Sequence, residues 1–139
     1  MIVELITTIY MQIVAYMNNF KTQFNQNVYE SRLTSFYAND ECGTGSCTAS
    51  GLCENNFEIN ENGWYTYQGK LVIATASDRL GYTEMQTYNL YDEVTLNIYG
   101  TDYQAIVLDV CGACMWDNRV DLFVTNRYSA IDTTIEVIK

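Results

Sequence analysis

The sequence predicts a mainly β protein, a small closed barrel that follows an N-terminal amphipathic helix. Residues 94–98 alternate apolar and polar side chains, as a strand with one buried face does. The runs 70–76 and 103–110 are apolar at consecutive positions, which indicates strands that are buried on both faces. That pattern favours a closed barrel over an open sheet with one solvated face. Residues 2–17 instead carry apolar side chains at helical spacing.

The N-terminal helix is expected over residues 2–20. Its apolar stripe consists of Ile2, Ile6, Ile9, Ile13 and Met17. Polar residues interrupt the segment, and it lacks the basic start and the cleavage site of a signal peptide. We therefore expect a helix that packs on another copy of the chain or on another protein, with a weak membrane anchor as the alternative.

Residues 21–32 are polar and rich in Asn and Gln, and we interpret them as a linker. This gives two units, a helix with its linker over residues 1–30 and a barrel domain over residues 31–139. Besides residues 94–98, short runs separated by Gly, Asn and Asp are expected to be strands, at 70–76, 103–110, 119–124 and 133–138. Residues 40–51 are expected to form a loop, and residues 60–69 an aromatic-rich turn.

The composition restricts the chemistry. A chain of 139 residues is long enough for one domain with its own core. The net charge of −10 disfavours nucleic acid as a partner, because phosphate binding needs clustered Lys and Arg, whereas a glycan remains compatible. Histidine is absent, which excludes Ser–His and Cys–His nucleophile pairs and His-ligated metals. Acid–base catalysis would fall to carboxylates, tyrosines or thiols.

The five cysteines fall into two groups, Cys42, Cys47 and Cys53 in the first and Cys111 and Cys114 in the second. This density indicates disulfides and an oxidising compartment, with one thiol left over. Several pairings remain open, including one that ties the second group to the first. Zinc is one alternative, because Cys111-x-x-Cys114 has ligand spacing and the first group offers further thiolates, and free thiols are the other.

Three stretches carry a family resemblance: TSFYANDECGTGSCTASG (34–51), LVIATAS (71–77) and GTDYQAIVLDVCGACMWDNRVDLFV (100–124). Together they resemble the three-aspartate (3D) domain, which is related to rare lipoprotein A, to expansins and to the barrel of membrane-bound lytic transglycosylase A. The most specific part is DVCGACMWDNRVD (109–121). In it, one set of residues follows the order of the family's loop with one residue inserted: Asp109, Gly112, Ala113, Asn118, Arg119 and Asp121.

The resemblance implies a six-stranded double-psi β-barrel with a groove that binds a polysaccharide, often peptidoglycan. It also implies that Asp121 is the general acid and that Asp109 supports it. The chemistry agrees, because cleaving a glycosidic bond needs one protonated carboxyl and a second group that stabilises positive charge on the sugar. A lytic transglycosylase of this kind needs no cofactor and no metal. The family's first aspartate is missing, since Thr75, Ala76 and Ser77 stand in its place.

The remaining candidates are assigned to substrate binding. Tyr37, Trp64 and Trp116 have aromatic faces that suit the apolar side of a sugar ring, and the alternative for each is a place in the core or over the end of the barrel. Asp40 lies in the opening loop, and Arg119 is expected to hold Asp109 ionised. The other candidates are polar or glycine positions of the matched motifs, namely Ser50, Gly51, Gly112 and Asn118. For each aspartate, the alternative is a structural role in which the carboxylate binds the loop backbone.

The sequence thus favours a peptidoglycan-cleaving lytic transglycosylase that forms 1,6-anhydro ends. Such a protein would act outside the cell or at the cell wall, or on a virion if a phage encodes it. A non-catalytic glycan-binding or wall-loosening module of expansin type is the first alternative, and the missing aspartate favours it. The second is a subunit of a phage tail or secretion machine, in which the N-terminal helix mediates packing.

Overall fold

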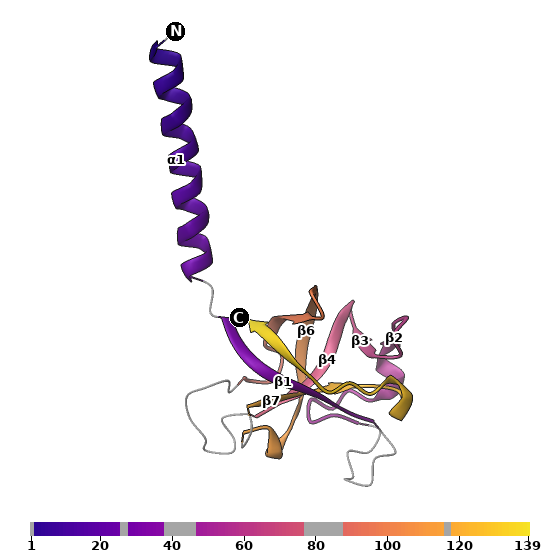
Figure 1. Cartoon of the computed structure of the whole chain (residues 1–139). Helices are drawn as coiled ribbons and strands as arrows, with labels where there is room; N and C mark the ends of the chain where they lie inside the picture. Colours follow the sequence, from indigo (N-terminus) through magenta and orange to yellow (C-terminus); the bar gives the residue numbers. More distant parts are fainter. Residues whose placement is uncertain (1, 26–27, 38–46, 77–87, 116–117) are drawn as a thin grey trace.

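The computed structural model of the chain describes residues 2–25, 28–37, 47–76, 88–115 and 118–139, with the side chains of the first range described as far as Met17. One long helix precedes a β-barrel (Figure 1). The helix is α1 (Ile2–Asn25). The strands are β1 (Val28–Phe36), β2 (Glu58–Ile59), β3 (Tyr65–Tyr67), β4 (Lys70–Thr75), β5 (Glu93–Ile98), β6 (Thr101–Val110), β7 (Arg119–Phe123) and β8 (Thr133–Ile138). Short 3-10 turns are η1 (Glu54–Asn56), η3 (Gly112–Met115) and η4 (Arg127–Ser129).

Six of the strands close into a ring. Neighbours follow the order β4–β6–β5–β8–β1–β7, and β7 pairs back onto β4, while β2 and β3 extend the sheet beyond β4. The β1–β7 and β4–β6 pairs are parallel and the other pairs in the ring are antiparallel. The predicted mainly β fold with a closed barrel and one N-terminal helix is confirmed. The two parallel pairs are compatible with a double-psi barrel.

The strands β4 and β6 are buried on both faces, as their continuous apolar runs predicted. Ile73 and Val107 face the interior cluster, to which all six barrel strands contribute. Val72 and Leu108 face a second cluster, which Phe36 and the residues around β2 and β3 help to form. Aromatic rings fill this second cluster. The ring of Phe123 stacks on that of Phe36 with 4.7 Å between ring centroids, and it packs against Tyr65 with 4.5 Å between centroids. The barrel wall between β4, β6 and β7 is therefore packed on both sides.

The linker predicted over residues 21–32 is wrong. Residues 21–25 continue α1 and residues 28–32 begin β1, so the domain boundary drawn at residue 30 falls inside this strand. The reason is that polar side chains occupy both faces of its first half. Ser31 points inward and is buried, and its hydroxyl donates a hydrogen bond to the carbonyl oxygen of Asn118 at 2.7 Å. Because its hydrogen bond lets a polar residue stay buried, Ser31 can occupy an inward position. The alternation of apolar and polar residues by which a strand is recognised in sequence is then lost.

Residues 60–69, predicted as a turn, contain the short strand β3.

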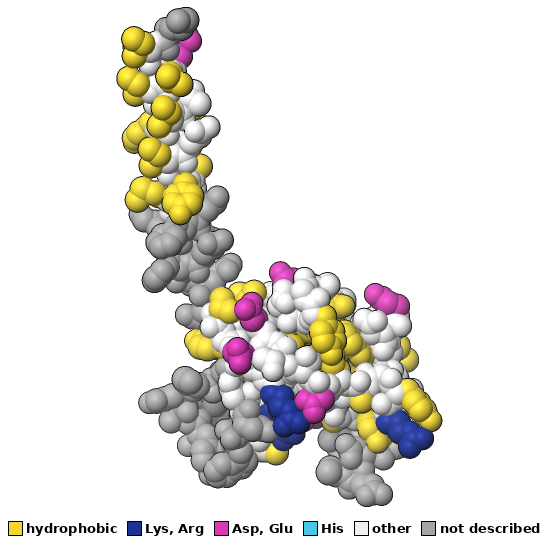
Figure 2. Space-filling view, viewed as in Figure 1, with side chains coloured by type: hydrophobic (Ala, Val, Ile, Leu, Met, Phe, Trp, Pro, Cys, Tyr) yellow, Lys and Arg dark blue, Asp and Glu magenta, His cyan; other side chains and the backbone are white. Residues whose placement is uncertain are grey.

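The side chains of α1 are exposed throughout residues 2–17, and in Figure 1 the helix stands off the barrel. Figure 2 shows hydrophobic side chains along much of this helix. Within the described part of the chain, no helix is long and apolar enough to cross a membrane.

The Tyr88 side chain provides a test of the barrel core. It is 2% exposed in the interior cluster, and no described residue forms a hydrogen bond with its hydroxyl. Burial, assisted by Tyr29 and Asp92, raises the pKa of Tyr88 to about 12. Because the unfolded chain releases this proton at its ordinary pKa of 10.0, the folded state should lose stability as pH rises from there to about 12.

We expect Tyr88→Phe to unfold at the same or a higher denaturant concentration at pH 7, because it removes a buried hydroxyl without a partner. The variant should also lose less stability than the wild type between pH 10 and 12. Chemical denaturation at both pH values measures this, with Tyr99→Phe as the control because Tyr99 is 76% exposed. A loss above about 1 kcal/mol at pH 7 would mean that the hydroxyl is satisfied in solution.

Candidate functional site

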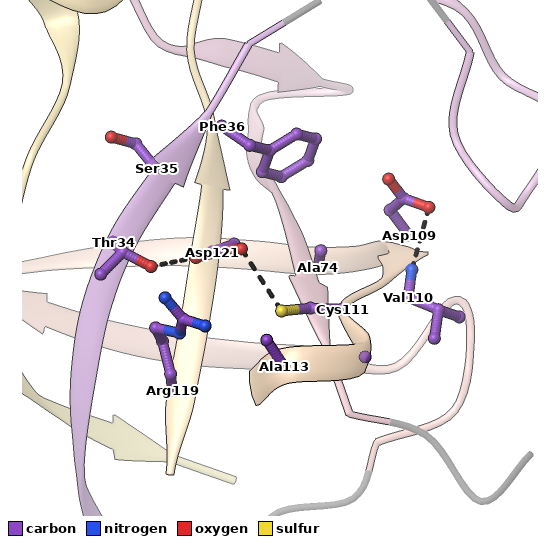
Figure 3. A pocket seen from close by; sticks show the side chains of 11 residues that line it. Thr34, Ser35, Phe36, Ala74, Asp109, Val110, Cys111, Ala113, Arg119 and Asp121 are labelled. Atoms are coloured by element: carbon purple, nitrogen blue, oxygen red, sulfur yellow. Dashed lines mark hydrogen bonds between the residues drawn. The ribbon is translucent and has the colours of Figure 1, made fainter. Parts of the chain in front are cut away.

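A cavity of about 460 Å³ opens where β1, β4, β6 and β7 meet the η3 turn (Figure 3). Its lining combines three charged side chains with small and apolar ones. The lining residues are Thr34, Ser35, Phe36, Ala74, Asp109, Val110, Cys111, Gly112, Ala113, Arg119 and Asp121. The structure thus brings the two predicted catalytic aspartates to one cavity, together with Gly112 and Arg119 from the same loop motif.

The strand register explains this arrangement. Ala74 is the neighbour of Asp121 across the β4–β7 pair and of Asp109 across the β4–β6 pair. A register shift between Ile73 and Ala74 makes Asp109 the partner of Ala74. The two aspartates therefore lie two strands apart, which corresponds to about 10 Å between their backbones. The methyl side chain of Ala74 between them leaves the cavity open.

Each oxygen of the Asp121 carboxylate has a close neighbour. The Thr34 hydroxyl on the neighbouring strand β1 donates a hydrogen bond to its Oδ1. Its Oδ2 lies 3.3 Å from the Sγ of Cys111. Arg119, two residues earlier on β7, shares the same strand face and lines the same cavity. The carboxylate is thus oriented by one hydroxyl, and a guanidinium lies on the same wall.

Asp109 has a structural role alongside its place at the cavity. Its Oδ1 accepts backbone N–H bonds from Ala49 at 2.8 Å and from Val110 at 2.9 Å. The Ser50 N–H donates to the Leu108 carbonyl at 3.0 Å and fastens the same segment to β6. The carboxylate therefore helps to hold the 48–51 turn against the barrel, which is the structural alternative that the sequence left open for this residue.

Both disulfides form within their cysteine group. Cys47 pairs with Cys53 and Cys111 pairs with Cys114, so the pairing between the two groups that the sequence allowed is not formed. Cys42 lies outside the described residues. A sulfur in a disulfide carries no proton, so the Cys111–Asp121 approach is a close contact with no hydrogen bond in this state. The two disulfides hint at an oxidising, non-cytoplasmic environment.

Asn118 and Trp64, both predicted to bind substrate, serve the fold. The Asn118 side chain donates to the Glu30 carbonyl at 2.8 Å, and its own carbonyl accepts from Ser31, which fastens the loop to β1. Trp64 is buried in the interior cluster, and its indole N–H donates to the Ser129 carbonyl at 3.1 Å. Its exposed fraction of 8% agrees with the alternative of a core residue and leaves little of the ring open to a sugar.

The other predicted residues lie away from the cavity or outside the description. Tyr37 packs against the interior cluster, and neither it nor Ser50 nor Gly51 lines the cavity. Asp40 and Trp116 lie outside the described residues. Sequence reasoning missed Thr34 and Ala74 as neighbours of Asp121. Thr34 stood in the stretch that carried the resemblance, whereas no local pattern marks Ala74, because its role comes from strand pairing alone.

Comparison with protein-family models finds no match, and comparisons with curated proteins and with solved structures find none either.

The disulfide assignment can be checked by non-reducing peptide mapping. We expect one linked species within residues 42–53 and another within residues 107–119, because each pair is joined across at most six positions of sequence. Reduction should shift each peptide by the mass of two hydrogens without separating chains, unless the protease cuts between the paired cysteines. A peptide from residues 42–53 joined to one from residues 107–119 would contradict the structure.

Proposed function

We propose that the cavity binds a glycan chain, with peptidoglycan as the substrate, and that Asp121 cleaves it as the general acid and base of a lytic transglycosylase. The observation that carries the proposal is the position of Asp121. Its carboxylate lines the cavity and is oriented through Oδ1 by Thr34, while Asp109 lies about two strand spacings away on the same cavity.

The chemistry uses one carboxyl group twice, first as an acid and then as a base. Protonated Asp121 donates to the bridging oxygen, the glycosidic bond breaks, and positive charge develops on the sugar ring. The Asp121 carboxylate then takes the proton from the sugar's own 6-hydroxyl, whose oxygen closes the 1,6-anhydro ring. No water enters the reaction and the acid is regenerated. Asp109 contributes negative charge that stabilises the cationic ring, and Arg119 offers a donor to sugar hydroxyls or to a carboxylate of the substrate.

The choice of substrate rests on the resemblance of the 109–121 loop to that of 3D domains and on a barrel that is compatible with the double-psi fold. Asp109 and Asp121 keep their places in that loop. A polysaccharide of the cell wall also agrees with an oxidising location, so we place the protein outside the cell or at the cell wall.

A non-catalytic glycan-binding module is the second candidate. Where the family carries its first aspartate, Thr75 and Ala76 are buried at the end of β4. Asp109 is engaged by two backbone N–H groups. With two of three carboxylates absent or committed, the cavity would bind sugar without breaking it.

Release of anhydro ends by the wild type separates the two candidates, and the Asp121→Asn variant tests the assigned acid. It keeps the shape and the hydrogen bond from Thr34 but cannot deliver a proton, so turnover should fall by a factor of about 10²–10⁴. Mass spectrometry of anhydro-muropeptides released from purified peptidoglycan measures turnover. Asp102→Asn is the matched control, because Asp102 is an exposed carboxylate at the other end of β6 that bonds Asn97.

Three outcomes are informative. A strong loss in Asp121→Asn with little change in Asp102→Asn supports the enzyme. Wild-type protein that pulls down peptidoglycan but releases no anhydro ends supports the binding module. Full activity in Asp121→Asn would place the acid elsewhere and contradict the assignment.

We also propose that α1 associates with other copies of the chain. Ile2, Ile6, Ile9 and Ile13 recur at intervals of four, three and four residues, which is a heptad pattern. Each of these side chains is exposed, from 47% to 76%. Isoleucine at both core positions of a heptad favours coiled coils of three or four helices over coiled coils of two.

Light scattering on the full chain should therefore give more than one copy, and deletion of residues 1–27 should give a monomer. The barrel should melt at about the same temperature after deletion, because β1 begins at Val28 and remains whole. Ile6→Glu with Ile13→Glu should dissociate the full chain, whereas Thr7→Glu with Thr8→Glu adds the same charge outside the stripe and should not. A full chain that is monomeric at high concentration would contradict self-association.

A further inference from the structure

We propose that Cys111, Cys114 and Asp121 form a zinc site once the Cys111–Cys114 disulfide is reduced, with a fourth coordination position open to the cavity. The inference stands apart from the proposed function, because it concerns metal binding and needs no glycan. Its starting point is a cluster in which the two sulfurs and a carboxylate oxygen of Asp121 all lie within 4.8 Å of one another.

The distances fit a tetrahedral metal. Zinc binds thiolate sulfur at about 2.3 Å and carboxylate oxygen at about 2.0–2.2 Å, so two such ligands on one tetrahedral ion lie about 3.5 Å apart. The Sγ of Cys111 and the Oδ2 of Asp121 are 3.3 Å apart. The two sulfurs are bonded in the present state and must move apart by rotation of their side chains. The Cys-x-x-Cys spacing permits this, since it recurs in zinc sites.

The surroundings already orient the oxygen ligand. The Thr34 hydroxyl occupies Oδ1 of Asp121, which leaves Oδ2 turned toward Cys111 (Figure 3). Hydrogen bonds of this kind to a ligand's second atom fix its direction and raise metal affinity. Charge balance is also favourable, because two thiolates and one carboxylate around Zn²⁺ leave one negative charge, and Arg119 on the same cavity wall supplies a positive one.

The site has three protein ligands, and both Cys111 and Asp121 line the cavity. Three ligands with an open position are typical of reactive zinc sites, in which a water or a substrate atom completes the tetrahedron. Cys114 is 1% exposed and Cys111 is 9% exposed, so the ion would be shielded from bulk water on the core side.

The chemistry is a two-electron exchange followed by metal binding. A dithiol gives up two electrons and two protons to the Cys111–Cys114 bond and becomes a disulfide itself, which leaves two thiols in the protein. Zn²⁺ then displaces both thiol protons and binds the thiolates and the Asp121 carboxylate. Oxidation expels the ion, so the disulfide and the zinc site are alternative states of the same residues.

The test uses cobalt as a spectroscopic probe for zinc, with a phosphine as reductant because it competes weakly for the metal. Ser is placed at Cys42, Cys47 and Cys53 in the full chain, so that Cys111 and Cys114 are the only thiols. After reduction, one equivalent of Co²⁺ should produce thiolate charge-transfer absorption and the intense visible bands of tetrahedral cobalt, and Zn²⁺ should abolish both. The oxidised protein should give neither signal.

Two variants test the ligands. Asp121→Asn should weaken Zn²⁺ binding in competition with a chromophoric chelator by at least about tenfold, and Thr34→Val should weaken it by about tenfold through the lost orientation of the carboxylate. Asp109→Asn is the control, because Asp109 lines the cavity without belonging to the cluster.

Reduced, folded protein without the charge-transfer band would overturn the proposal. So would unchanged affinity in Asp121→Asn, which would mean that the two thiolates bind alone. If circular dichroism shows that the triple Ser variant does not fold, the same titration is made on reduced wild type and on reduced Cys111→Ser. The proposal requires that Cys111→Ser bind one tetrahedral cobalt fewer than the wild type. None of these readouts depends on peptidoglycan cleavage.

Discussion

The pairing of β4 with β7 closes the barrel, and the cavity depends on it. Ile73 faces Leu122 and Ala74 faces Asp121 across this pair, while β4 also holds β6 in parallel on its other edge. Because β4 is shared, its Ala74 is a neighbour of both aspartates. An open sheet would leave β7 paired with β1 alone and Asp121 far from Asp109. Apolar side chains on both faces of β4 stabilise the closure, since they bury Ile73 inside the barrel and Val72 outside it.

The same closure sets the chemistry of Asp121. Its neighbours come from three separate segments, with Thr34 on β1, Ala74 on β4 and Cys111 at the end of β6. The two proposals draw on this one carboxylate in different states of the molecule. With the Cys111–Cys114 disulfide formed, Asp121 is available as a proton donor. With the disulfide reduced and zinc bound, its lone pair is committed to the metal, so a single residue cannot serve both roles at once.

The barrel and the helix α1 differ in how their apolar side chains are covered. In the barrel, the inward positions of the six strands are filled, and the cavity lies at the β4–β7 seam. Along α1, the apolar side chains of residues 2–17 are exposed. In the proposed self-association, isoleucines at heptad spacing would gain free energy by burial against equivalent helices, and the barrel would take no part in the contact.

The sequence by itself determined the elements that local periodicity encodes. The helix over residues 2–17 and the strands β4 to β8 were predictable, because each repeats apolar side chains at the period of its own structure or buries a continuous run. Asp109 and Asp121 were predictable as candidates because a short loop and two strand ends frame them.

The tertiary structure decided the rest. Strand β1 escaped prediction because the inward-facing Ser31 is satisfied by Asn118, a residue distant in sequence. Trp64 was a candidate for sugar stacking from its residue type alone. In the closed barrel Tyr103 packs edge-on against it, and its indole N–H donates a hydrogen bond to the Ser129 carbonyl. The placement of Ala74 between the aspartates and the bond from Thr34 to Asp121 depend on which strands pair and in what register. Register is set by the joint packing of all six strands, and no single stretch of sequence contains it.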